Sequence, residues 1–206
     1  MTKTAYITVA VLSILIALTT LRALPLGLGQ AFFDMADHIQ QRKIFFLMHI
    51  IAASIALLCG VPQFAKNIRQ QYPQIHRWTG RVYVIAVMVG ALGGMSLALN
   101  AIAGTIAIWG FTLLSLLWVI TTGMAIWHVR AGRISLHRDW MIRSFALTFA
   151  AVTLRLQLGG LVFGTGMDYE QASLILAWSC WVPNLIFAEW WIAQKRPGKL
   201  LVSPGA

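Results

Sequence analysis

The chain has 206 residues, of which 59% are hydrophobic and only 11% are charged, and its formal net charge is +10. Soluble domains average roughly 45–50% apolar and about 25% charged residues, so this composition excludes a soluble globule and a disordered chain. A mean hydropathy of +0.74 instead predicts an all-α, polytopic membrane protein. Because the basic residues lie between long apolar runs, they indicate membrane topology, and we do not expect nucleic acid as a partner.

Six apolar runs are long enough to cross a bilayer, which takes about 20 residues of helix. They cover residues 5–27, 44–65, 78–100, 104–127, 140–164 and 171–193. We expect a bundle of six transmembrane helices and a single integral-membrane domain over residues 1–206. The first run has the position of a signal peptide, but the sequence around Arg22 is a poor cleavage site, so this run is predicted to remain as the first helix. The connection 28–43 predicts a short interfacial helix.

Lysine and arginine residues are concentrated on one side of the predicted bundle. If the N-terminus lies inside, the inner segments contain Lys3, Lys66, Arg69, Arg77, Arg81, Arg130, Arg133, Arg138, Arg143, Lys195, Arg196 and Lys199, while acidic residues such as Asp34 fall outside. The positive-inside rule then places both termini in the cytoplasm, and the protein in the cytoplasmic (inner) membrane of a prokaryote as a multi-pass protein. The expected partners are the lipid bilayer and anionic lipid headgroups. The inner basic rim that would contact these headgroups includes Arg77, Arg81, Arg138 and Arg143.

One face of the fifth span is polar along its length. His137 and Arg155 are 18 residues apart, which is five helical turns, and Ser144 and Thr148 lie on the same face. Ionisable residues are costly in hydrocarbon and usually face the interior of a bundle. Two interpretations remain open: the helix lines a route for a cofactor, a substrate or protons, or its hydroxyls bond only to the backbone one turn before them.

The second and third spans each combine a histidine with small residues on one face. His49 and Gln63 share a face with alanines and a glycine in the second span, and His76 and Tyr83 share a face with three glycines in the third. Small residues allow another helix or a flat ligand to approach closely. Tight helix packing is the preferred interpretation, and a planar cofactor beside a histidine ligand is the alternative.

The sixth span contains a proline and an acidic residue. Pro183 lies within the apolar run, where proline frees backbone carbonyls and often produces a kink. Glu189 lies near the inner end of the span, and we expect it to meet Arg138 or Arg143 from the fifth span. A structural ion pair is the preferred interpretation for Glu189, and a proton relay is the alternative.

Two segments carry a resemblance to a known family. They are His76-Arg77-Trp-Thr-Gly80-Arg81-Val-Tyr83 and His137-Arg138-Asp-Trp140-Met141-Ile-Arg143-Ser144, with His49 upstream. Together they resemble prokaryotic membrane proteins of domain-of-unknown-function family 2306, and the resemblance covers about residues 40–195. It implies a polytopic protein of the inner membrane, and the family has no established activity.

A looser similarity is to the haem-bearing bundles of cytochrome b561 and the ferric reductases. Those families usually place two histidines on one helix, which gives two stacked haems, whereas no predicted span of this chain has such a pair. One haem near the inner face, held by His76 and His137, agrees with the positions of both residues at inner helix ends. His128 is an alternative to either residue.

The sequence leaves three hypotheses of function, and it does not decide whether the protein is an enzyme. The leading one is a b-type haem or quinone-linked redox protein, with His49, His76, His128 and His137 as candidate haem ligands and no metal beyond haem iron. The second is a small transporter or channel with a polar route along the fifth span. Its intramembrane candidates are Arg155, Ser144, Thr148, Gln63, Tyr83 and Glu189. The third is a non-catalytic assembly subunit that binds a membrane protein partner.

Overall fold

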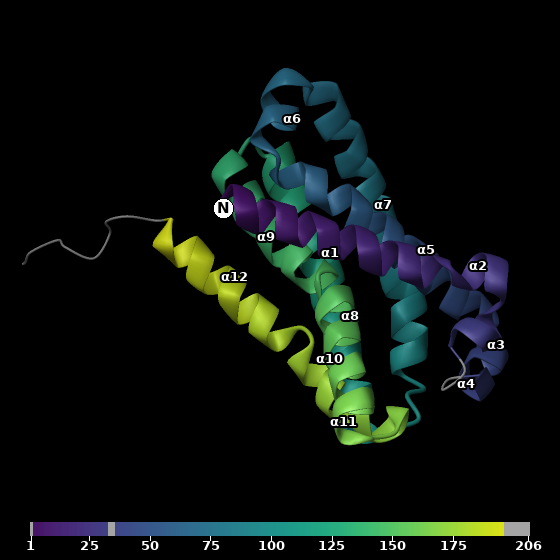
Figure 1. The fold of residues 1–206 in the computed structure, drawn as a ribbon. Coiled ribbons are helices and arrows are strands. Elements are labelled where there is room, and N and C mark those ends of the chain that lie inside the picture. The colour runs from purple at the N-terminus through teal and green to yellow at the C-terminus, as the bar shows by residue number, and fades with distance from the viewer. Residues whose placement is uncertain (1, 33–35, 196–206) are drawn as a thin grey trace, which may run out of the picture.

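The computed structural model describes residues 2–32 and 36–195. In this part of the chain, six helical segments are long and apolar enough to cross a membrane, and no strand is present. The predicted all-α bundle is therefore confirmed (Figure 1). Three residues to which the sequence assigns a side of the membrane, Asp34, Arg196 and Lys199, lie outside the described residues.

Each span consists of one long helix or of two consecutive shorter elements. The first span joins α1 (Lys3–Leu21) to α2 (Ala23–Leu26), and the second joins α5 (Lys43–Gly60) to the 3-10 turn η2 (Val61–Phe64). The third and fourth spans are α7 (Pro73–Ala98) and α8 (Thr105–Arg130). The fifth joins α9 (Ile134–Thr148) to α10 (Ala150–Thr165), and the sixth joins α11 (Tyr169–Ser179) to α12 (Val182–Gln194). The short helix α6 (Lys66–Gln71) connects the second span to the third.

The connection between the first two spans differs from the prediction of one interfacial helix. Its described part forms two short helices, α3 (Leu28–Ala31) and α4 (Ala36–Gln41). Gly27, just before α3, has a φ of 86°, a conformation that costs other residues energy, so the chain changes direction there. At Phe32 the backbone leaves the helical region again, with φ −137° and ψ 55°.

Two helical hairpins form the centre of the bundle. The helix α5 packs along α7, α8 packs along α9, and the contact of α7 with α8 joins the two pairs. The remaining spans lie outside this centre, because α1 packs on α5, α11 on α8, and α12 on α9. The starts of α7 and α9 and the ends of α8 and α12 meet at one end of the bundle. We call it the basic end, because its exposed residues include Arg77, Arg130, Arg138 and Lys195.

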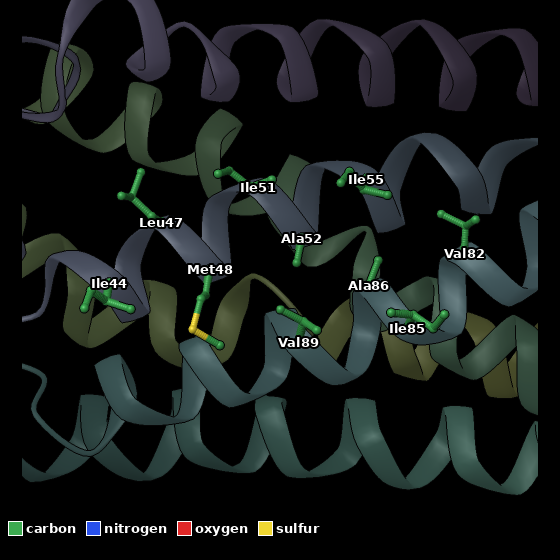
Figure 2. Close-up of a pocket in the computed structure, with 10 residues that line it drawn as sticks. All are labelled: Ile44, Leu47, Met48, Ile51, Ala52, Ile55, Val82, Ile85, Ala86 and Val89. Carbon is green, nitrogen blue, oxygen red and sulfur yellow. The ribbon is translucent and has the colours of Figure 1, made fainter.

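The outer surface of the spans is apolar. Phe163 is 92% exposed and Leu92 is 64% exposed, which would be unfavourable in water but suits contact with lipid chains. An open groove of about 540 Å³ runs between α5 and α7 and is lined only by apolar side chains, from Ile44 and Met48 on α5 to Ile85 on α7 (Figure 2). These features support a bundle that is surrounded by lipid.

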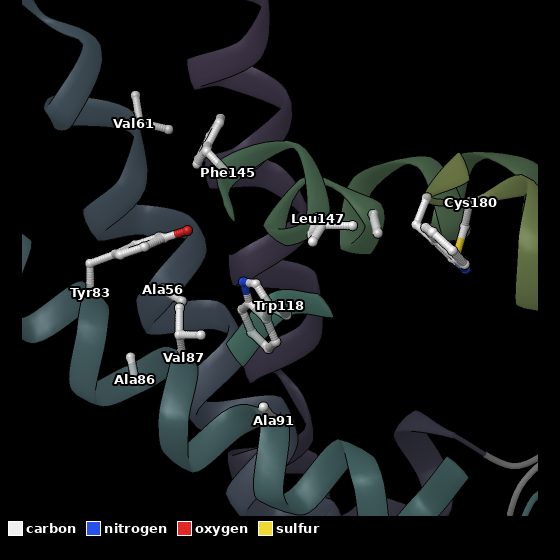
Figure 3. Packing of buried hydrophobic residues seen from close by; sticks show 12 residues of the cluster. Ala56, Val61, Tyr83, Ala86, Val87, Ala91, Trp118, Phe145, Leu147 and Cys180 are labelled. Atoms are coloured by element: carbon white, nitrogen blue, oxygen red, sulfur yellow. The ribbon is translucent and has the colours of Figure 1, made fainter. Parts of the chain in front are cut away.

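The largest buried cluster lies where the two hairpins meet. Tyr83 from α7 is completely buried and extends into this cluster, where Trp118 from α8 and Phe145 from α9 pack nearby (Figure 3). Small residues on the facing helices, such as Ala56 and Ala86, leave room for these rings. The core therefore combines large aromatic side chains with small residues, and it brings the polar face of span five against α7 and α8.

Candidate functional site

A network of hydroxyl groups is buried at the centre of the bundle. The Tyr83 hydroxyl lies 2.7 Å from the Ser144 hydroxyl and 2.7 Å from the Thr148 hydroxyl. Ser144 and Thr148 are one turn apart on α9, so both face the same neighbour. All three residues are buried. The polar face predicted for span five therefore points into the bundle, where Tyr83 contacts it.

The helix α8 contributes two further members of this network. The Trp118 indole N–H donates to the Thr148 hydroxyl over 2.9 Å, and the Thr122 hydroxyl lies 2.7 Å from that of Ser144. Thr122 also contacts the Trp118 carbonyl at 2.8 Å, and Thr148 donates to the Ser144 carbonyl at 3.0 Å. The hydroxyls of span five thus bond both across helices and to the backbone. Sequence reasoning missed Trp118 and Thr122, although their spacing of one turn is a usable signal.

Two histidines from different helices lie at the basic end. His76 and His137 are each the fourth residue of their helix, α7 and α9 respectively, and they are close enough to interact electrostatically. The Nδ1 atom of His137 donates to the Ala125 carbonyl over 2.9 Å, because a carbonyl only accepts. In the neutral imidazole with this hydrogen bond, the Nε2 atom carries the lone pair. The Nδ1 atom of His76 is buried and has no hydrogen-bond partner within the described part of the chain.

His128 lies near this pair, at the end of α8. It is 5% exposed, and its Nδ1 atom is also buried without a hydrogen-bond partner among residues 2–32 and 36–195. Its ring stacks on Trp140 with an interplanar angle of 19° and contacts Trp127 at a centroid distance of 4.7 Å. Buried polar atoms in proteins are usually hydrogen-bonded. Of the four buried side-chain polar atoms without a partner in the described part of the chain, two therefore belong to histidines of the basic end, and the others belong to Ser13 and Thr112.

His49 lies apart from these histidines, at the contact of α5 with α7. Its Nδ1 atom donates to the Gly90 carbonyl over 2.8 Å. A Cβ atom on Gly93 would lie 2.6 Å from the Phe45 carbonyl oxygen, and one on Gly94 would lie 2.9 Å from His49 Nδ1. The two helices are thus in direct contact through the glycines. Helix packing, the preferred interpretation of these small residues, is what the structure shows, and no planar cofactor fits between α5 and α7 at this level.

Arg155 and His49 belong to the same end of the bundle, opposite the basic end. The two residues are close enough to interact electrostatically, and the Arg155 guanidinium donates to the Ala151 carbonyl of its own helix over 3.0 Å. Within the described residues, no hydrogen bond links Thr148 to Arg155. The polar face of span five is therefore divided into a central part, with Ser144 and Thr148, and an outer part, with Arg155.

The fifth and sixth spans are both interrupted, and polar side chains bridge the interruptions. The fifth changes from α9 to α10 at Phe149, and the sixth changes from α11 to α12 at Cys180 and Trp181. The break in the sixth span lies just before Pro183, as its ring requires. The Thr153 hydroxyl donates to the Cys180 carbonyl. The Asn184 amide donates to the same carbonyl and to the Thr153 hydroxyl, and both of these Asn184 bonds measure 3.0 Å.

The remaining polar candidates form local contacts. Arg143 binds the Glu189 carboxylate through two nitrogens, at 2.5 and 2.8 Å, so Glu189 forms an ion pair with one of its two expected partners. The Gln63 amide donates to the Thr79 hydroxyl over 2.6 Å and ties the end of the second span to α7. Both contacts lie toward the basic end, where Arg77, Arg81 and Arg138 are exposed.

A family model described as "Predicted membrane protein (DUF2306)" matches residues 46–192. The chain belongs to this family. The matched range includes His49, the central hydroxyl network, the three histidines of the basic end and Glu189, so the DUF2306 region contains the whole candidate site. No curated protein and no solved structure matches the chain, and the looser similarity to cytochrome b561 gains no support from these comparisons. No group of three or more His, Cys, Asp or Glu residues that could hold a metal ion occurs in the described part.

Proposed function

We propose that the protein is a redox membrane protein that would bind one haem b at the basic end, with His76 and His137 as the residues that would hold it. The observation that carries this proposal is that these two histidines, each the fourth residue of its helix, lie within electrostatic range of each other at the basic end. Two ligands are enough for a haem iron, so the proposal needs no larger cluster of ligating residues.

The chemistry of the two imidazoles suits this role. Histidines that bind metals commonly donate their second ring N–H to a backbone carbonyl, which fixes the ring and leaves the other nitrogen as the ligand. His137 has such a bond to Ala125. The buried, unpartnered nitrogen of His76 supports the presence of a further group at this end. His128 is the alternative ligand, since its Nδ1 atom is also buried without a hydrogen-bond partner in the described part of the chain.

Basic residues near His76 support this proposal. Arg69 is within electrostatic range of His76, and Arg77 follows His76 in the chain, so these two arginines are the residues that would pair with haem propionate groups. When bound, the haem would supply one-electron transfer. A quinone dissolved in the membrane, or another membrane protein, is the electron partner we infer for a site at this depth. We assign the protein to the inner membrane of a prokaryote, with the basic end in the cytoplasm.

The test is an absorption spectrum of the detergent-purified protein, expressed with ample haem, before and after reduction with dithionite. We expect a sharp reduced-minus-oxidised band, which is lost or shifted in the His76→Gln and His137→Gln variants. The matched control is His49→Gln, which removes an imidazole at the opposite end and should keep the band. A flat spectrum of the wild-type protein, or loss of the band only in the control, would overturn the proposal.

A second candidate function is transport along the inner face of span five. It is favoured by the buried hydroxyls of Tyr83, Ser144 and Thr148, together with the paired interruptions of the fifth and sixth spans, because transporters often place discontinuous helices around a central site. Proteoliposomes with a pH-sensitive dye inside would test proton flux under a membrane potential. This function predicts flux in the wild-type protein and its loss in Arg155→Gln. Absence of flux in the wild type would contradict proton transport.

A further inference from the structure

Cations stacked on tryptophans surround the basic end. Four such pairs occur in the described part of the chain: Arg81 over Trp78 at 4.9 Å, Arg133 over Trp127 at 5.3 Å, Arg143 over Trp140 at 4.6 Å and Lys195 over Trp191 at 4.4 Å. They come from the start of α7, the α8–α9 turn, the start of α9 and the end of α12. Tryptophans prefer the boundary between hydrocarbon and headgroups, so the stacked cations lie at headgroup level.

The positive charge of this end exceeds the acidic charge near it. Arg130, Arg133 and Arg138 are exposed on and beside the α8–α9 turn. The acidic residues of α9 and α12 are Asp139, which is buried, and Glu189, which already binds Arg143. Two carboxylates cannot neutralise this many cations. The surface of the basic end therefore presents several positive charges that no acidic side chain of α9 or α12 neutralises.

Two of these cations come from elements that pack against each other, because Arg138 lies on α9 and Lys195 directly follows α12. The pKa of Lys195 is lowered, first by its partial burial and then by the neighbouring Arg138, while Asp139 acts in the opposite direction. Like charges at short range repel. A phosphate group between them would replace this repulsion with two charge-assisted contacts.

We propose that the basic end binds the phosphate groups of anionic phospholipids, with Arg133 and the pair of Arg138 and Lys195 as the headgroup contacts. A lipid fits better than a soluble anion because apolar surface continues directly from the cations. Trp127, beneath Arg133, is 53% exposed, and Ile134 beside it is 61% exposed. Acyl chains can cover these side chains while the headgroup phosphate meets the arginines. This surface is separate from the arginines assigned above to haem propionates.

The experiment is native mass spectrometry of the detergent-purified full chain, titrated with phosphatidylglycerol or with phosphatidylcholine of the same acyl chains. The double variant Arg133→Gln/Arg138→Gln removes two cations of the basic end, and we call it the rim variant. The control variant, Arg22→Gln/Lys43→Gln, removes the same charge at the opposite end. Each basic residue near an anionic membrane surface contributes about 1 kcal/mol. Because the rim variant loses two arginines, we expect it to bind phosphatidylglycerol about 30-fold more weakly. The control should bind within about twofold of the wild type.

Three results would overturn the lipid proposal. Equal binding of the two lipids by the wild-type protein would overturn the proposal, as would equal losses in the rim and control variants. Displacement of phosphatidylglycerol by inorganic phosphate at comparable concentration would show a site for soluble anions and would also overturn it. Because the spectrum of the haem proposal is measured separately, either proposal can fail without the other.

Discussion

Tyr83 shows how a single hydroxyl can join three helices. Its side chain is completely buried, and its oxygen contacts Ser144 and Thr148 on α9, which in turn contact Thr122 and Trp118 on α8. Removing a polar group from water is costly unless it finds partners. In this network each hydroxyl has at least two, so its burial is compensated and the relative positions of α7, α8 and α9 are fixed.

Replacing Tyr83 with phenylalanine should destabilise the protein by about 1–2 kcal/mol, because two buried hydroxyls lose a partner while the ring volume is kept. Thermal unfolding in detergent would measure this loss. The matched control is Tyr72→Phe, at a tyrosine that is 55% exposed, and its stability should equal that of the wild type. Equal stability of both variants would mean that the network does not hold the helices together.

The sequence predicted part of this network. The 18-residue spacing from His137 to Arg155 correctly indicated that Ser144 and Thr148 face inward, and the glycine face of span three included Tyr83. Trp118 and Thr122 were missed, because α8 is apolar on most sides and its rotation is decided by packing. Which hydroxyl meets which partner depends on the depth and rotation of three helices, and periodicity within one helix does not contain that information.

At the scale of elements, glycines determine the approach of α5 to α7. A Cβ atom on Gly93 would lie 2.8 Å from the backbone nitrogen of His49, and a Cβ atom on Gly94 would lie 2.9 Å from the His49 ring. Contact between backbones increases dispersion attraction, which drives helix association in lipid where the hydrophobic effect is absent. The same contact presents the Gly90 carbonyl to His49.

Gly93→Ala should destabilise the protein by about 1–3 kcal/mol, because its Cβ would meet backbone atoms that cannot move aside easily. The control is Gly123→Ala on α8, where an added Cβ meets nothing within 4 Å. That substitution should be neutral, or stabilising by less than about 1 kcal/mol through helix propensity. Unfolding in detergent with increasing denaturant compares the two. A harmless Gly93→Ala would contradict the close approach.

The interruptions of the fifth and sixth spans depend on side chains from the neighbouring element. Thr153 on α10 donates to the carbonyl of Cys180, which lies between α11 and α12. Thr153→Val keeps the shape but removes this donor, so we expect a loss of about 1 kcal/mol. Thr165→Val, which removes only a bond to the same helix on an exposed face, should cost less. Unfolding of both variants under the same conditions gives the comparison, and equal costs would contradict a bridging role for Thr153.

At the scale of the whole molecule, two central hairpins are packed against each other in related ways. His76 and His137 are 61 residues apart, and so are Tyr83 and Ser144, which are hydrogen-bonded. The second pair is in direct contact, and the first pair lies within electrostatic range. This arrangement brings the His76-Arg77 and His137-Arg138 segments to one end of the bundle. The candidate histidines and the basic residues therefore share that end.

The orientation of this bundle is testable with single cysteines. In a background with Cys59→Ala and Cys180→Ala, Ser135→Cys lies at the basic end and Thr105→Cys lies at the opposite end. If the basic end is cytoplasmic, a membrane-impermeant maleimide should label the Thr105 variant in intact spheroplasts. It should label the Ser135 variant only after lysis. The reverse labelling pattern would place the basic end outside and would contradict the positive-inside assignment.

The sequence by itself determined the class of the protein, its six spans, the inward face of span five and the pairing of Glu189 with an arginine of that span. These features follow from hydropathy, helical period and charge, which are properties of single segments. Only the tertiary structure decided that His76 and His137 lie within electrostatic range of each other, that His49 packs against glycines, and that Trp118 and Thr122 complete the hydroxyl network. Such contacts depend on how helices distant in sequence are rotated and shifted against each other, and in lipid this is set by close packing and hydrogen bonds rather than by hydrophobicity.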